Sequence, residues 1–251
     1  MKGSIKPGEL IKRKPNIRIV PVLAAAIAVS LLLTVPGIYA KNNTGIKVFA
    51  GFADQDDTLE GFDKDDWKYI LVNKQHPIPE DLTVELGSIH NGLKVDKRVA
   101  GPLDEMLEAA KEDGIKLLVI SPYRSPEKQE KLFEKKIGRM MRQGESFLEA
   151  YGETAQAVTI PGSSEHEIGM AVDITTKEHI TLDEAYADSE GGRWLKEHCH
   201  EYGFILRYPE GKEDVTGIEF EPWHYRYVGK EAAGYIMDNG LTLEEFVSML
   251  K

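Results

Sequence analysis

The chain has 251 residues, 41% of them hydrophobic, with a formal net charge of −11 and a single cysteine. This length and apolar share allow one membrane or export segment plus one domain with a full hydrophobic core, and they give no sign of wholesale disorder. An acidic chain is a poor ligand for nucleic acid, so we expect no such partner, and one cysteine permits no disulfide within the chain.

The first 40 residues differ in charge from the rest. They carry six Lys or Arg and one Glu, a balance of +5 that leaves −16 on the remainder. Residues 19–40 contain no charged side chain, and about 20 apolar residues are enough to span a bilayer. Basic residues before such a span favour a cytoplasmic N-terminus. We therefore predict a basic cytoplasmic tail over 1–18 and a transmembrane anchor over 19–40.

A cleaved signal peptide is the alternative for this segment. Signal peptides have a shorter apolar core and small residues before the cut. Here the apolar run is long, and Ile38 stands two residues before Ala40. This favours an uncleaved, single-pass anchor. In both cases the body of the chain is exported, and its lack of cysteine pairs fits a bacterial cell envelope.

The predicted domain covers residues 66–251 and follows a stalk over 41–65 that is rich in Asn, Asp, Gly and Thr. Its first helix is indicated by apolar residues at helical spacing from Leu103 to Ala110, and Gly114 can end it. The apolar run 115–120 has the length of a strand.

Arg124 follows that predicted strand and precedes another helix. Ser125 and Pro126 are typical of the first residues of a helix, and Gly144 is expected to end it. Arg124 is therefore placed between a strand end and a helix start, which is a rigid position for a binding group.

The stretch 164–173 supplies half of a predicted metal site. His166 and Asp173 are seven residues apart, a spacing that does not suit one helical face but suits a loop running into a strand. Catalytic zinc takes three protein ligands and leaves a fourth position for water. We expect His224 to be the third ligand and Glu221 to be the base for that water.

Each segment alone has a simpler interpretation, because a His near an Asp is usually a solvated or hydrogen-bonded pair. Together they favour a metal, since each segment supplies the donors that the other lacks. The chain after Asp173 is expected to form a helix over 191–202, a strand over 204–208 and a loop over 211–217. A strand pair over 219–228 would carry His224, and two short helices near 230–238 and 242–250 would close the domain.

The two motifs also resemble a known family. Ser-x-His-x-x-Gly-x-Ala-x-Asp at 164–173 and Glu-Pro-Trp-His-x-Arg-Tyr-Val-Gly at 221–229 are similar to the signature of VanY-type D,D-carboxypeptidases, and 72–79 resembles the entry segment of their domains. Those proteins are zinc peptidases that trim peptidoglycan stems, related in fold to lysostaphin and the hedgehog signalling domain. The resemblance implies an α+β fold with a small central antiparallel sheet flanked by helices, and Zn²⁺ as cofactor.

The resemblance also implies roles for residues that bind substrate. An arginine fork matches a carboxylate with two parallel hydrogen bonds, so Arg124 is expected to clamp the free C-terminus of the peptide. The alternative for Arg124 is a surface salt bridge. Gln129, about one helical turn further, is expected to support the same peptide end. Ser164 is expected to bind substrate or position the metal loop, with the capping of a turn as the alternative.

The expected function is removal of the terminal D-Ala from peptidoglycan stem pentapeptides by a membrane-anchored zinc D,D-carboxypeptidase. Two alternatives stay open at this point. One is an L,D-carboxypeptidase that acts on tetrapeptide stems, and the other is a non-catalytic cell-wall binding module. Glu221 argues against the second, because a binding module has no need of a carboxylate beside an open zinc position.

Overall fold

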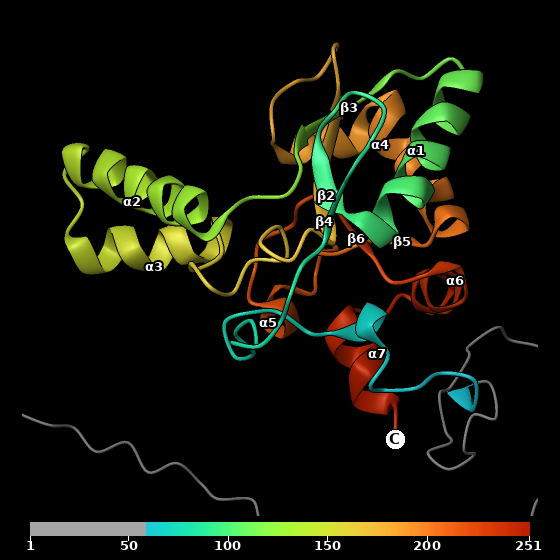
Figure 1. Ribbon diagram of the computed structural model, residues 1–251. Helices are drawn as coiled ribbons and strands as arrows, with labels where there is room; N and C mark the ends of the chain where they lie inside the picture. Colours follow the sequence, from blue (N-terminus) through green and yellow to red (C-terminus); the bar gives the residue numbers. More distant parts are fainter. Residues whose placement is uncertain (1–58) are drawn as a thin grey trace, which may run out of the picture. The chain divides into compact units, whose positions relative to one another are not determined.

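Figure 1 shows the computed structural model, which describes residues 59–251. The predicted tail, the predicted anchor over 19–40 and most of the predicted stalk lie outside the described residues. Within residues 59–251, no helix is both long and apolar enough to cross a membrane.

A four-stranded antiparallel sheet occupies the centre of the domain, in the order β3-β4-β6-β5. Its strands are β3 (Leu117–Ser121), β4 (Ala171–Thr176), β5 (Phe204–Leu206) and β6 (His224–Tyr227). A separate two-stranded sheet pairs β1 (Leu86–Ser88) with β2 (Lys94–Asp96). The predicted α+β fold with a small antiparallel sheet is confirmed for this part of the chain.

The main core lies between the sheet and two helices, α1 (Lys97–Glu112) and α4 (Glu190–His198). Leu103 and Met106 of α1 are fully buried, as the helical spacing predicts. The helix ends before Gly114, whose φ of 86° belongs to the left-handed region that glycine adopts most easily. Short 3₁₀ turns at Trp67–Tyr69, Glu184–Asp188 and Cys199–Tyr202 complete this layer.

A second core forms around the last two helices, α6 (Lys230–Asp238) and α7 (Leu243–Met249). Phe62 packs edge-on against Phe246 of α7, with ring centroids 5.2 Å apart. A residue of the predicted stalk over 41–65 therefore packs into this core.

The third core belongs to a helix pair, α2 (Pro126–Arg142) and α3 (Phe147–Ala157), that extends to one side of the sheet (Figure 1). Ser125 caps α2 by accepting a hydrogen bond from the Lys128 backbone N–H at 3.3 Å. The helix ends at Arg142, before Gly144. The predicted start and end of this helix are thus confirmed.

The sequence was less informative between β5 and β6. Residues 219–228 contain one strand, β6, instead of a pair, and the expected loop over 211–217 contains a short helix, α5 (Glu213–Thr216). Pro222 has no N–H to donate to a strand ladder. The chain instead turns at this point, and the backbone N–H of His224 donates to the carbonyl of Glu221 at 3.1 Å.

Candidate metal centre and active site

Strand pairing brings two of the predicted ligands together. Asp173 of β4 and His224 of β6 are direct partners in the antiparallel register. Residues opposite each other in such a pair project from the same face of the sheet, with Cβ atoms about 5 Å apart. This single strand pairing therefore brings together two side chains that are separated by fifty residues of chain.

His166 reaches the same place from the loop before β4. Its carbonyl accepts hydrogen bonds from the backbone N–H groups of Gly169 and Arg124, both at 3.1 Å. Gly169 has a φ of +68°, and a Cβ there would come within 2.5 Å of the Asp96 backbone nitrogen. This glycine is required because the loop packs against the start of α1.

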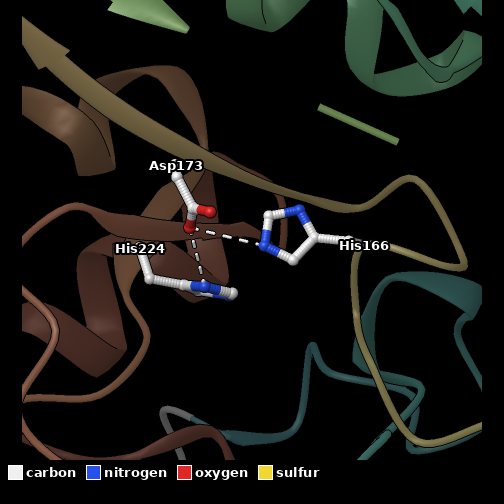
Figure 2. Close-up of side chains that lie close together, drawn as sticks. All are labelled: His166, Asp173 and His224. Atoms are coloured by element: carbon white, nitrogen blue, oxygen red, sulfur yellow. Dashed lines mark ion pairs between the residues drawn. The ribbon is translucent and has the colours of Figure 1, made fainter. Parts of the chain in front are cut away.

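The three donors form one buried cluster (Figure 2). Asp173 Oδ1 is 3.3 Å from His166 Nε2 and 3.1 Å from His224 Nδ1. One donor atom from each residue lies within 4.8 Å of the other two. Zinc bonds to nitrogen and oxygen are about 2.0–2.2 Å long, so these atoms can share one ion.

The second nitrogen of each imidazole contacts a neighbouring oxygen, and these contacts set the orientation of the two rings. His166 Nδ1 lies 3.1 Å from the carbonyl oxygen of Pro122, to which it can donate. His224 Nε2 faces Glu165 Oε2 at 3.5 Å. Metal-binding histidines hold their second N–H in this way, with a carbonyl or a carboxylate. Within the described chain, His166 Nε2 and Asp173 Oδ1 are buried without a hydrogen-bond partner. The site therefore fits a His₂Asp zinc ion.

Protonation of the two histidines differs in the absence of a cation. Burial lowers the pKa of His166 to about 4, although Asp173 opposes this effect, so the ring is neutral and its lone pair is free. Burial also acts to lower the pKa of His224, but the neighbouring carboxylates of Asp173 and Glu165 outweigh it and raise the pKa to about 9. A metal ion must therefore displace a proton from His224 when it binds.

Glu221 lies beside this cluster, with Oε2 3.5 Å from His224 Nδ1. Its backbone N–H donates to the carbonyl of Tyr208 at 3.1 Å, which fixes the turn before β6. Burial raises the pKa of Glu221 to about 8; His224 and Arg124 oppose this shift and Asp173 adds to it. A carboxyl group whose pKa is near neutrality is suited to accept and return a proton.

Glu165 forms a buried charge network behind the metal ligands. Its Oε1 accepts hydrogen bonds from Arg207 Nε at 2.8 Å and from Arg226 at 2.7 Å. Burial alone would raise the pKa of Glu165, but the two guanidinium groups hold it well below its usual range. Arg226 of β6 thus pairs with this buried acid on the sheet that carries His224.

We expect Glu165→Gln to lower the free energy of unfolding by about 3–5 kcal/mol, because it leaves buried cations without their shared counter-charge. Denaturant titration at pH 7 measures this change. The native pKa of Glu165 is depressed, so its contribution is present above its ordinary pKa and is lost as the pH falls through the native value.

Glu108→Gln is the matched control for this prediction. Glu108 pairs with Lys111 on the exposed surface of α1, where such a pair contributes about 0.5 kcal/mol or less. Equal losses in the two variants would show that the buried network does not stabilise the fold.

Arg124 lies at the edge of the same cluster. Its Nη2 is 3.5 Å from Asp173 Oδ2, and its Nη1 donates to Gln129 Oε1 at 2.6 Å. Gln129 is fully buried and donates in turn to the carbonyl of Thr159 at 2.7 Å. The structure thus places Gln129 behind Arg124, where it orients the guanidinium group. Ser164 is also buried; its carbonyl accepts from the Glu167 backbone N–H at 2.9 Å, which begins the metal loop.

These groups open into a cavity of about 730 Å³. Arg124, Glu221 and the three metal donors line it, and Trp223 forms part of its wall. The cavity has the size of a typical small-molecule or peptide site. A buried carboxylate beside a three-ligand metal centre in such a cavity defines the class: a hydrolytic zinc enzyme.

Comparison with known proteins agrees with this class. A family model described as VanY, D-alanyl-D-alanine carboxypeptidase, matches residues 92–230. A D-alanyl-D-alanine carboxypeptidase of Enterococcus faecalis (strain ATCC 700802 / V583) is 38% identical, and the alignment covers 91% of this chain and 84% of that protein. The chain belongs to the VanY D-alanyl-D-alanine carboxypeptidase family.

Solved structures of similar proteins support the same assignment. VanYB in complex with D-alanine-D-alanine is 41% identical with a TM-score of 0.68, covering 74% of this chain and 99% of that chain. A mutant of VanY from a VanB-type resistance cassette, a D,D-pentapeptidase in complex with Zn(II), is 41% identical with a TM-score of 0.66, covering 72% and 99%. The LdcB LD-carboxypeptidase is 39% identical with a TM-score of 0.59, covering 72% and 86%.

The prediction of a zinc metallopeptidase of the D-alanyl-D-alanine carboxypeptidase type is confirmed by the family match and the His166, Asp173 and His224 cluster. Zinc as the cofactor agrees with the Zn(II) complex of the similar structure. The alternative of a non-catalytic binding module is therefore set aside.

Two functional features were not found from the sequence. Glu165 lies between Ser164 and His166, and its position next to a ligand was the available signal. Arg207 directly follows β5, and nothing in its local sequence indicates that it reaches a carboxylate 42 residues away. Both belong to the support of the metal site, which depends on contacts between distant segments.

Proposed function

We propose that this protein removes the terminal D-Ala from peptidoglycan stem pentapeptides. The observation that carries the proposal is the convergence, in one cavity, of a metal cluster, a buried acid and a buried arginine. A peptidase needs the first two, and the recognition of a free peptide C-terminus needs the third. The D-Ala-D-Ala bound to VanYB supports the choice of substrate.

Zinc, when held by His166, Asp173 and His224, supplies Lewis-acid activation of water and of a carbonyl group. Glu221 then has the role of proton carrier. Its carboxylate accepts the proton that water loses, and it delivers that proton to the nitrogen of the departing D-Ala. The position of Glu221 beside the ligand His224 makes both transfers short.

Arg124 fixes the direction of the substrate. Its Nη1 is held by Gln129, while its Nε is buried without a partner among the described residues. A guanidinium group with an unused donor can bind the terminal carboxylate and orient the last peptide bond for attack. In this proposal Gln129 acts through Arg124, and Ser164 acts through the loop that carries His166.

We expect Arg124→Lys to lower kcat/KM for a peptide with a free C-terminus by about 10- to 100-fold, mainly through KM, because hydrogen bonds to a charged group are lost. Steady-state kinetics with a pentapeptide that ends in D-Ala-D-Ala measures the effect.

The matched substrate for this prediction is the same peptide with a C-terminal carboxamide. The unmodified enzyme should use it poorly, and Arg124→Lys should not lower its rate further. Zinc content must be equal in both proteins, since Arg124 also contacts Asp173. An equal loss of kcat/KM on both peptides would mean that Arg124 does not bind the terminal carboxylate.

L,D-carboxypeptidase action is the second candidate, because LdcB is nearly as similar in sequence as VanYB. Purified protein with zinc is incubated with a pentapeptide stem and with a tetrapeptide stem, and released D-alanine is measured. Release from the pentapeptide alone supports the first candidate, and release from the tetrapeptide alone supports the second. No release from either peptide contradicts both.

We also propose that residues 19–40 anchor the protein in the cell membrane with its catalytic domain outside the cytoplasm. The support is the charge-free stretch and the basic residues before it. In a bacterial host, the full chain should resist alkaline extraction from membranes, and its domain should be cut by protease added to spheroplasts. A domain protected from protease in intact spheroplasts contradicts this orientation.

A further inference from the structure

One wall of the cavity is basic although the chain as a whole is acidic. Four lysines of α2 line it: Lys128, Lys131, Lys135 and Lys136. Outside the metal centre and Glu221, Glu219 is the one acid among the lining residues that the structure describes. The outer part of the cavity therefore carries an excess of positive charge that the metal chemistry does not use.

The lysines and the glutamates of α2 lie on different faces of the helix. Positions 128, 131, 132, 135 and 136 fall on one face of a helix with 3.6 residues per turn. The acids Glu127, Glu130 and Glu134 fall on a different flank, and the core residues Phe133 and Ile137 fall on the third. Among residues 59–251, the salt bridges of lysine are formed by other lysines, and none of these four takes part in one.

The lysine row begins next to the predicted carboxylate clamp. Arg124 stands immediately before the cap of α2, and Lys128 is in the first turn. From Lys128 to Lys135 the helix rises about 10 Å, which equals the length of about three residues of an extended peptide. Leu132 lies between these lysines, is 40% exposed and lines the cavity, so the wall also offers an apolar contact.

We propose that this lysine row is a subsite for a carboxylate of the substrate that lies upstream of the scissile bond. The inference rests on the proposed function, since it concerns the part of the same peptide that extends away from Arg124. A stem peptide with an unmodified acidic residue near its middle would then be preferred over one whose acid is amidated. The lysine row would determine specificity without contact with the reacting atoms.

Two synthetic peptides test the proposal. One is L-Ala-γ-D-Glu-L-Lys-D-Ala-D-Ala, and the other differs only by a carboxamide in place of the free α-carboxylate of D-Glu. Zinc-loaded protein that carries Glu221→Gln binds each peptide without turnover, and calorimetry gives both dissociation constants. We expect the carboxylate peptide to bind about three- to tenfold more tightly, as two or three exposed ion pairs allow.

Variants identify the source of this preference. Lys131→Gln/Lys135→Gln, added to the same protein, should reduce it to less than about twofold, because exposed ion pairs with substrate are lost. Lys116→Gln/Lys196→Gln changes the net charge equally at two exposed lysines outside the cavity and should leave the preference unchanged. High salt should also weaken the preference in the protein with all its lysines, because exposed charges are screened.

The result that overturns the proposal is equal affinity for the two peptides, a preference that survives Lys131→Gln/Lys135→Gln, or no binding of either peptide. Release of D-Ala by the protein with Glu221 intact is measured separately. Release from both peptides without a difference in affinity leaves the proposed function standing and the subsite refuted. A difference in affinity without release of D-Ala leaves the subsite standing and refutes the proposed function.

Discussion

Glu221→Gln is expected to lower kcat by about 100- to 10,000-fold on a peptide that ends in D-Ala-D-Ala. The glutamine amide has nearly the same shape as the carboxylate but cannot accept a proton from water. The three metal donors are unchanged, so the variant should still bind one zinc ion per chain. Stopped assays of D-Ala release and metal analysis of the same sample measure both quantities.

Glu219→Gln is the matched control for Glu221. Glu219 is an exposed acid that lines the same cavity two residues earlier in the chain. It forms no ion pair with His166, Asp173 or His224. Its replacement should change kcat by less than about threefold, as expected of a surface charge. Should both variants keep the full rate, neither carboxylate is the base and the proposed mechanism fails.

His166→Ala is expected to remove both zinc and activity, and the loss of rate should exceed that of Glu221→Gln. A catalytic zinc site has three protein ligands, and removal of one leaves the ion and the groups it activates without a stable position. The same loss should follow treatment of the unmodified protein with a chelator, and added zinc should restore the rate. Zinc content after dialysis and D-Ala release are the measurements.

The control for this prediction is His179→Ala. His179 pairs with Asp183 at 2.8 Å in a solvent-accessible loop, so its removal should leave zinc content and rate unchanged. If the His166→Ala protein retains one zinc ion and the full rate, His166 is not a metal ligand.

Local signals in the sequence were sufficient for much of the fold. Ser125 and Pro126 marked the start of α2 because capping and proline placement act within one helical turn. Gly114 and Gly144 marked helix ends through the positive φ that those positions adopt. The pattern was less informative near Glu221, where Pro222 and a turn replace the expected strand.

The metal cluster could be predicted because its motifs are short and dense in donors. Asp173 and His224 were chosen as ligands by residue type, and their pairing in the register explains why the choice was right. The support of the cluster could not be predicted in the same way. Glu165 and Arg207 meet only after β5 and the metal loop have packed together, and no local periodicity records such a contact.

The lysine row shows a related limit. Helical spacing alone places Lys128, Lys131 and Lys135 on one face, but an exposed basic face is common on soluble proteins. The basic face indicates a binding role only because the fold turns it toward the metal cavity. The information lies in how the fold places α2 along the cavity and not in the segment itself.

The double hydrogen bond between Arg207 and Glu244 has a consequence for the far end of the chain. Nη1 and Nη2 of Arg207 donate to the two carboxylate oxygens of Glu244 in α7, at 2.8 and 2.6 Å, and Nε of the same side chain holds Glu165. Glu165 in turn faces the ligand His224. The final helix therefore acts as a distant brace for the zinc ligand, and shortening the C-terminus would loosen the metal although no donor atom had been touched.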